Sequence, residues 1–550
     1  MKEKYNNIQK IYPWLILGFF FVVLLFLNAC YLDHWLDSDM AAEMMFSKLL
    51  AEEGSIFATT NWYYSTEFRF LYTHLLMGPL FRITDNWHVI RMLTNIVFYV
   101  LMLASYFYMV KPLCMNESKK VLCAIALLLP FSENVMLHMH MGNTYMSHVI
   151  IILFEMGIFL RLSAEGNCKK WLWIPYMLLA VICGLSGVRY MLALQCPLLL
   201  TAVTYWMKSD KFRAFRMAFI NDESVEASET NKDRLTVFKT FWKDNCKWTE
   251  QSFRYIVVSI LGLIGTLIGY VINVVYVSKA YSFQTYETTN FIHVYEGVFM
   301  ERLQNAFGAI LMLFGYIPDK SVLSLRGVVS LAAFGMMLVL AIVAWRVRKT
   351  EHTENRFIVC FFYISFFLNT FVFVFTSSTL VPRYYITSFV FLIPMFAIYL
   401  SEEKLLLDRY LLAGVMTVCI LLGTAKTSLS MMATDKNEAR RPVAEFLMEN
   451  GYHQGYATYW NGNIMQELSD GKIQMANVSD PEELEFFKWS SETAYYEDTF
   501  ARGKTFLLLT AEEMTKYENS QAVKSGEVVY ESDAFTILHY DSKDILFGVE

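Results

Sequence analysis

Apolar and polar stretches alternate along the first four-fifths of the chain in a pattern typical of repeated membrane crossings. The apolar stretches run for about 18 to 25 residues, enough for a helix to span a hydrocarbon core of about 30 Å. Because backbone groups in lipid must bond internally, each stretch is predicted to be helical. Eleven spans are predicted, at residues 12–30, 88–110, 120–137, 143–162, 171–187, 189–207, 254–278, 321–345, 356–377, 384–400 and 409–427.

The basic residues predict how these spans are oriented. Lysines and arginines gather before the first span, after the second and fourth, throughout the loop 208–253, and around residues 346–356. All of these fall on one side if the N-terminus is cytoplasmic, where basic loops are enriched. No small-residue cleavage site follows the first span, which is therefore expected to be retained.

Three regions are predicted on the outer face, at residues 31–87, 279–320 and 428–550. In the first, apolar residues recur at helical spacing over 40–52 and 67–82, which predicts two amphipathic helices on the membrane surface. The apolar piece 305–318 is too short to span and is predicted to be a re-entrant or interfacial helix.

The tail from residue 428 onward differs in composition from the rest of the chain. Five short segments are typical of strands (GYATYW, KIQMANV, KTFLLLT, GEVVYES and FTILHY), and two are typical of helices (NEARRPVAEFLMENG and AEEMTKYENS). The chain is thus predicted to be a polytopic α-helical membrane protein, residues 1–427, with a small extracytoplasmic α/β domain, residues 428–550.

Composition agrees with this architecture. Hydrophobic residues make up 55% of the 550 residues and charged residues 18%, which excludes an ordinary soluble protein. The predicted outer regions contain none of the nine cysteines. Exported regions without disulfides favour a bacterial plasma membrane.

An acidic cluster, Asp33, Asp37 and Asp39, follows the first span in the segment YLDHWLDSDMAAEM. A carboxylate at the membrane surface could remove the proton from an attacking hydroxyl. Alternatively, Asp37 or Asp39 would cap the helix predicted over 40–52. The two roles are compatible, and Asp39 is favoured as the catalytic residue, with Asp37 second. Asp33 is expected to face solvent.

Metal binding is an alternative for two sets of residues. The pair Asp37 and Asp39 could hold a divalent cation, Mg²⁺ or Mn²⁺, which would neutralise a donor phosphate. His138, His140 and His148 could bind zinc or copper. The first two histidines do not share a helical face, however, so partly solvated interfacial histidines are the simpler interpretation.

Arginines near the predicted outer span ends run against the usual charge bias: Arg91, Arg189, Arg326 and Arg383. An arginine within a span costs about 2.5–3.5 kcal/mol, so it is usually paired or functional. A guanidinium suits an anionic phosphate leaving group. Arg383 with Tyr384, in TLVPRYY, is the first candidate for substrate binding, and Arg189 is the second. The alternative is snorkelling to lipid headgroups.

Three further polar residues complete the candidate substrate-binding set. Glu67 and Arg69 could line the same cavity, or could pair with each other on a surface helix. Glu133 follows Pro130 inside a predicted span, where a polar side chain is expected to face a cavity.

With these residues in place, the chain resembles the GT-C superfamily of integral-membrane glycosyltransferases, in its bacterial, mannosyltransferase-like branch. The resemblance rests on LDSDMAAEM after the first span and on GYATYWNGNIMQELSDGKI in the tail. It implies a catalytic aspartate at Asp37 or Asp39 and a polyprenyl-phosphate-linked sugar as donor. It also implies an envelope glycan, lipid or protein as acceptor.

Two other functions remain open from the sequence. A transporter or flippase of an anionic lipid-linked substrate would use the same arginines, although the internal repeats typical of transporters are not seen. A catalytically inactive relative that binds an envelope partner would look the same at this level.

Overall fold

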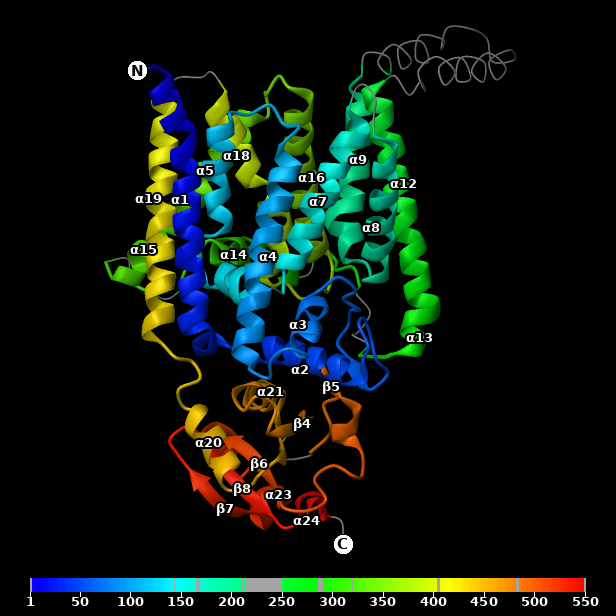
Figure 1. The fold of residues 1–550 in the computed structure, drawn as a ribbon, viewed down its shortest axis with the longest axis vertical. Helices are drawn as coiled ribbons and strands as arrows, with labels where there is room; N and C mark the ends of the chain where they lie inside the picture. Colours follow the sequence, from blue (N-terminus) through cyan, green and yellow to red (C-terminus); the bar gives the residue numbers. More distant parts are fainter. Residues whose placement is uncertain are drawn as a thin grey trace, which may run out of the picture.

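The computed structural model describes residues 2–142, 144–164, 169–209, 212, 250–284, 290–295, 297–318, 320–321, 323–402, 406–480 and 484–548. A bundle of long helices stands on a C-terminal α/β region, residues 441–548 apart from 481–483 (Figure 1). In the described ranges, eight helices are long and apolar enough to cross a membrane, judged by length and composition. The predicted fold class is confirmed, and the protein is a multi-pass membrane protein.

Eight of the eleven predicted spans correspond to these long segments. They are formed by α1 (Lys2–Tyr31), α4 (Trp87–Val110), α7 (Met146–Ser163), α12 (Gln251–Ile272) with α13 (Ser278–Ala280), α15 (Leu325–Val347), α16 (Thr353–Phe375), α17 (Ile386–Phe389) with α18 (Leu392–Ser401), and α19 (Leu406–Ala433). In Figure 1, α1 and α19 run side by side at one edge of the bundle. The predicted loop 208–253 lies mostly outside the described residues.

The other three predicted spans are shorter helices: α5 (Glu117–Ala124), α8 (Trp173–Leu185) and α9 (Cys196–Met207). The span predicted over 120–137 is broken, because α5 ends at Ala124 and the chain reaches Pro130, which has no N–H to continue a helix. A π-helical turn, η3 (Met136–Met141), follows the break.

Helices α8 and α12 pack with their backbones in direct contact. A Cβ atom added at Gly184 would lie 1.9 Å from the carbonyl oxygen of Thr266, and one added at Gly269 would lie 1.9 Å from that of Val181. Small residues permit this approach, as in many membrane helix pairs. The pair therefore forms a rigid wall of the bundle.

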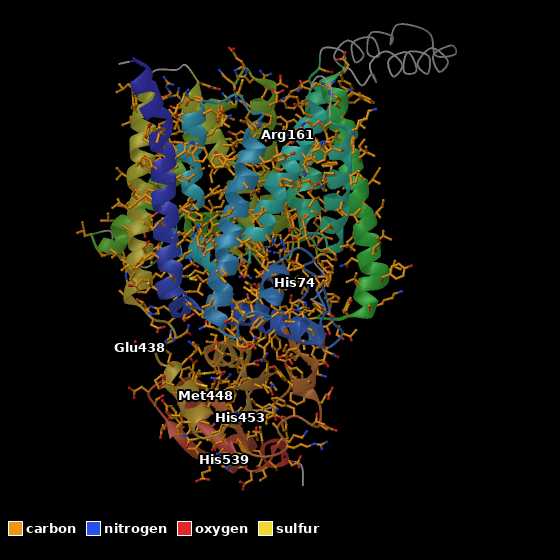
Figure 2. All side chains as sticks on the ribbon, in the orientation of Figure 1. His74, Arg161, Glu438, Met448, His453 and His539 are labelled. Atoms are coloured by element: carbon orange, nitrogen blue, oxygen red, sulfur yellow. The ribbon has the colours of Figure 1, made fainter. Side chains whose placement is uncertain are left out.

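Two helices of the first loop lie between the bundle and the C-terminal region. Helix α2 (Ser38–Glu53) confirms the helix predicted over 40–52, and Gly54 ends it with a φ of 71°. Of the helix predicted over 67–82, only α3 (His74–Leu80) forms. Figure 2 labels His74 there, just above the C-terminal region.

Helix α14 (Gly297–Leu313) covers most of the segment predicted as a short interfacial helix over 305–318. It begins earlier than predicted and ends two residues before Gly315, whose φ is 97°. One of its faces packs on the bundle through Ala306, Ala309 and Ile310, which are buried. The helix is therefore held against the neighbouring spans along its length.

The C-terminal region contains a five-stranded sheet in the order β4-β3-β6-β8-β7. Its strands are the five predicted from sequence: β3 (Gln454–Thr458), β4 (Gln474–Val478), β6 (Thr505–Thr510), β7 (Glu527–Glu531) and β8 (Phe535–Tyr540). The first three are parallel, and the last two are antiparallel to their neighbours. Helix α20 (Arg441–Glu449) leads into this sheet, and α21 (Tyr459–Leu468) follows β3 directly.

A second sheet ties three distant segments together. Strand β1 (Trp62–Tyr64) of the first loop pairs with β2 (Ser282–Phe283) on one side and with β5 (Ser491–Glu492) on the other. The sequence did not predict these short strands. They fasten the C-terminal region to two loops of the bundle.

Candidate active site

Asp37 caps the N-terminus of α2, as predicted. Its Oδ1 accepts a hydrogen bond of 2.9 Å from the backbone N–H of Met40. Burial, together with the nearby carboxylate of Asp39, raises the pKa of Asp37 to about 6, although the Met40 N–H and the charges of Arg91 and Arg383 oppose the shift. A carboxylate with such a pKa is well suited to accept a proton near neutral pH.

Asp39 is in contact with the C-terminal region. The hydroxyl of Tyr459, at the start of α21, donates a 2.8 Å hydrogen bond to Asp39 Oδ1. Nearby, the side-chain amide of Asn463 reaches the carbonyl oxygen of Ser38 at 3.5 Å. Sequence reasoning missed Tyr459 because it was assigned to the end of a strand.

A partly buried ion pair joins α2 to the segment before α3. Arg69 donates to Glu43 at 2.9 Å, and the same carboxylate accepts hydrogen bonds from the hydroxyls of Tyr72 and Thr73. Burial raises the pKa of Glu43 to about 7 despite the attraction of Arg69. The helix over 40–52 is predicted to lie on the membrane surface, so this pairing of one of its acidic side chains with Arg69 corrects that prediction.

Glu67 and Arg69 therefore do not pair with each other. Glu67 forms an ion pair of 3.0 Å with Arg189 instead. Residues 65–73 form no helix, and the predicted helix over 67–82 is shortened to α3. Arg189 also donates to the Tyr145 hydroxyl at 3.1 Å and lies 5.6 Å from the ring centre of Tyr384.

Arg383 lies at the turn before α17 and is half-buried. Within the described residues it forms no ion pair. Its positive charge nevertheless acts to lower the pKa of Asp37 and the pKa of His138. Of the four predicted arginines, it alone combines proximity to Asp37 with the lack of a carboxylate partner in this part of the chain. Arg326 is exposed at the start of α15.

Arg91 is fully buried and joins the bundle to the C-terminal region. Its Nε and Nη2 atoms each donate 2.8 Å hydrogen bonds to the two carboxylate oxygens of Glu467, in α21. Nη2 also donates to the carbonyl oxygen of Met40 at 2.8 Å. This bidentate pair fixes α21 against α2, and so positions Tyr459.

Glu133 forms a 2.7 Å ion pair with Lys426 of α19. Lys436, in the linker after α19, lies 3.4 Å from the ring centre of Trp35. Burial lowers the pKa of Lys436, while Glu133 and Asp37 partly compensate. Neither lysine was identified as a candidate from the sequence, because a lysine near the end of a span usually indicates only how the span is oriented in the membrane.

Asp33 is partly exposed, since 38% of its side chain is accessible, and it also has a partner in the fold. Its carboxylate lies 2.9 Å from Nδ1 of His88. Burial alone would raise the pKa of Asp33, but the hydrogen bond and charge of His88 hold it below its usual value. Asp33 is thus paired with His88, whereas Asp37 and Asp39 accept hydrogen bonds from Met40 and Tyr459.

Each of the three histidines contacts a different neighbour, although Nδ1 of His140 and Nδ1 of His148 are buried without a hydrogen-bond partner in the described part of the chain. His138 bonds to Thr144 at 2.8 Å, His140 to the Leu127 carbonyl oxygen at 2.8 Å, and His148 stacks on Tyr190. Across the described residues, no group of three or more metal-ligating side chains is found. Asp37 and Asp39 each have one oxygen engaged by a hydrogen-bond donor, so a divalent cation there would rely on their other oxygens, substrate and water. Metal binding by this pair stays a prediction.

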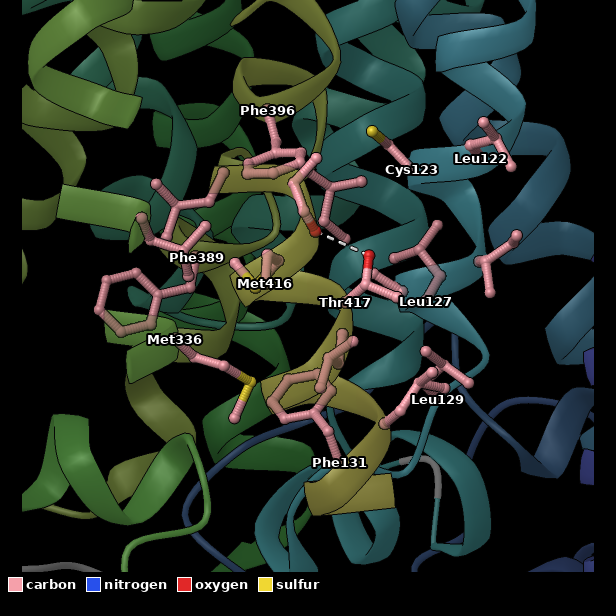
Figure 3. Close-up of a pocket in the computed structure, with 18 of the residues that line it drawn as sticks. Leu122, Cys123, Leu127, Leu129, Phe131, Met336, Phe389, Phe396, Met416 and Thr417 are labelled. Atoms are coloured by element: carbon pink, nitrogen blue, oxygen red, sulfur yellow. Dashed lines mark hydrogen bonds between the residues drawn. The ribbon is translucent and has the colours of Figure 1, made fainter. Parts of the chain in front are cut away.

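An apolar cavity of about 680 Å³ lies inside the bundle (Figure 3). Its lining comes from α1, α5, α15, α18 and α19 and from the segments beside them, and includes Phe131, Met336, Phe389 and Met416. The end nearest the C-terminal region is lined by residues on either side of Glu133, namely Phe131 and Val135. At the opposite end lie Lys119 and Arg409.

The arrangement of helices, loops and C-terminal region can be compared with solved structures. ArnT from Cupriavidus metallidurans in the apo state matches over 96% of this chain and 97% of that chain, with a TM-score of 0.52 and 10% sequence identity. The fold is similar to that of ArnT. The structure of ArnT bound to undecaprenyl phosphate matches over 96% and 98% of the two chains, with a TM-score of 0.54 and 10% identity.

At this identity the likeness to ArnT concerns the fold. No protein-family model and no curated protein sequence matches the chain. The roles of individual residues must therefore be argued from the geometry of this site.

Proposed function

We propose that the protein is a membrane glycosyltransferase that moves a sugar from a polyprenyl-phosphate donor to an acceptor on the outer face of a bacterial plasma membrane. One observation carries the proposal: an apolar cavity inside the bundle is lined by Phe131 and Val135, on either side of Glu133, and by Ile386, which follows the turn that holds Arg383. The charge of Arg383 in turn acts on the carboxylate of Asp37. The GT-C resemblance of the sequence and the ArnT-like fold support it.

The cavity is suited to an isoprenoid chain. Its lining side chains are almost all aliphatic, aromatic or thioether, and a chain held there would present its phosphate at the charged end. Arg383 starts the turn that leads into Ile386, a lining residue, so its guanidinium is placed to meet that phosphate. Arg189, the second candidate, is already paired with the carboxylate of Glu67.

The reaction forms one carbon–oxygen bond and breaks another. The acceptor hydroxyl oxygen attacks the anomeric carbon, the bond from that carbon to the phosphate oxygen breaks, and the lipid phosphate leaves with the electron pair. Asp37 takes the hydroxyl proton, and Arg383 stabilises the negative charge that grows on the phosphate. Asp39, whose oxygen is held by Tyr459, orients the acceptor rather than serving as the base.

The function is tested with purified protein in lipid nanodiscs and a panel of radiolabelled polyprenyl-phosphate sugars. We expect release or transfer of sugar from one donor, with a slower reaction in Arg383→Ala. A parallel reaction with chelator tests the divalent cation. Donor binding without turnover in every condition would instead favour a transporter, a flippase or an inactive binding protein.

The pH dependence of transfer follows from the raised pKa of Asp37. A base works only when ionised, so the rate is expected to fall as the pH drops through about 6 and to level off above it. Initial rates measured between pH 4.5 and 8 check this. A rate that stays constant down to pH 5 would exclude Asp37 as the base.

A further inference from the structure

Charged side chains close the end of the cavity that faces the C-terminal region. The α19 residues that line the cavity extend from Arg409 to Leu421, which is about 18 Å at 1.5 Å per residue. Lys426 follows on the same helix, about 7.5 Å beyond Leu421. Glu133, its partner at 2.7 Å, lies between Phe131 and Val135, which both line the cavity.

Other cationic groups reach the same place from separate elements. Lys436 comes from the linker after α19 and is close enough to Lys426, Glu133 and Asp37 to interact with each electrostatically. Arg383 comes from the turn before α17 and interacts with Asp37. Lys426 is thus tied by geometry to the residues at this end of the cavity, through Glu133, and Lys436 and Arg383 add positive charge from two further elements.

One hydrogen-bond donor at this end has no acceptor among the described residues. Lys426 is only 18% exposed and is committed to Glu133, whose side chain is 44% exposed. The ammonium group of Lys436 lies over the ring of Trp35, and the indole N–H of Trp35 is buried without an acceptor in the described part of the chain. A donor without an acceptor beside two lysines is suited to binding an anion.

We infer that Lys426 binds the phosphate of an isoprenoid lipid whose chain fills the cavity, and that Glu133 holds Lys426 until that phosphate arrives. The lipid phosphate replaces the Glu133 carboxylate as the partner of Lys426, and Lys436 contributes a second positive charge. The exchange needs no change of fold, because Glu133 is already the more exposed member of the pair and can turn to solvent. The inference rests on the proposed function for the identity of the lipid.

The two members of the pair have opposite expected effects on binding. Lys426→Met removes a charged ligand of the phosphate and is expected to weaken binding of a short-chain polyprenyl phosphate roughly 10- to 100-fold. Glu133→Gln removes the competing carboxylate and is expected to tighten binding several-fold. A pair with only a structural role would make both variants weaker binders.

Affinities are measured in nanodiscs by displacement of a fluorescent polyprenyl phosphate. The competitors are the unlabelled polyprenyl phosphate, the polyprenol of equal length and inorganic phosphate. The polyprenol is expected to bind wild type and Lys426→Met alike, because its chain meets only the apolar lining. Lys543→Met is the matched control, since that lysine pairs with Asp498 in the C-terminal region, away from the cavity.

The inference is overturned if Glu133→Gln weakens binding, if Lys426→Met binds the phosphate lipid as wild type does, or if inorganic phosphate competes as well as the lipid. Its failure is distinct from failure of the proposed function. Sugar transfer with no effect of the two variants would reject the Lys426 site alone. The expected shifts in binding without any transfer would reject the glycosyltransferase and keep the lipid phosphate site.

Discussion

Asp37→Asn is expected to lower the rate of sugar transfer by about 10²- to 10⁴-fold, the usual contribution of a general base. The amide keeps the size of the side chain and can still accept the Met40 N–H through its oxygen, so the cap of α2 persists. It cannot accept the proton of the acceptor hydroxyl. The loss should appear in kcat, with KM for the lipid donor little changed.

Asp33→Asn is the matched control for this experiment. It makes the same chemical change four residues earlier and removes the negative charge that faces His88, but it leaves Asp37, Asp39 and their partners in place. Its rate should remain within a few-fold of wild type. Equal losses in the two variants would mean that Asp37 acts through the fold of the loop and not as the base.

Glu467→Gln is expected to loosen the C-terminal region from the bundle. The substitution leaves the guanidinium of Arg91 buried without a counter-charge, and loss of one partner of a buried ion pair typically costs about 3–5 kcal/mol. The variant should be cleaved by a protease in the linker before α20 at a concentration that spares wild type. Transfer should decline in parallel, since Tyr459 is no longer held against Asp39.

The double variant Arg91→Met/Glu467→Met tests whether docking is lost because a buried charge is unpaired or because hydrogen bonds are missing. Replacing both ions by apolar side chains is often neutral for stability, so protease resistance should return. If the double variant is cleaved as readily as Glu467→Gln, the docking depends on the hydrogen bonds of Arg91 to Glu467 and Met40 rather than on removal of an unpaired charge.

The membrane architecture and the strands of the C-terminal region could be predicted because both depend on local periodicity. Helices buried in lipid and strands with an apolar face each leave a regular signal in the sequence. The short strands β1, β2 and β5 leave none, since each has two or three residues and forms only through distant partners.

The candidate site was predicted in part for the same reason. The position of Asp37 as the cap of α2 could be predicted because it stands at a helix start directly after a span, where local sequence is informative. The ion pairs Glu43 with Arg69, Arg91 with Glu467, and Glu133 with Lys426 join residues 26, 376 and 293 positions apart. Pairing of this kind is decided by tertiary packing, which one sequence does not reveal.

The contact between Tyr459 and Asp39 has a consequence for biosynthesis. The two residues are 420 positions apart, so ribosomes working at about 5–20 residues per second need roughly 20 to 80 seconds to make the second after the first. During that interval α21 does not yet cover the first loop, and β5 is not yet paired with β1. The proposed catalytic centre is thus completed last, and a nascent chain inserted in the membrane is expected to stay inactive until its C-terminal region has been made and folded.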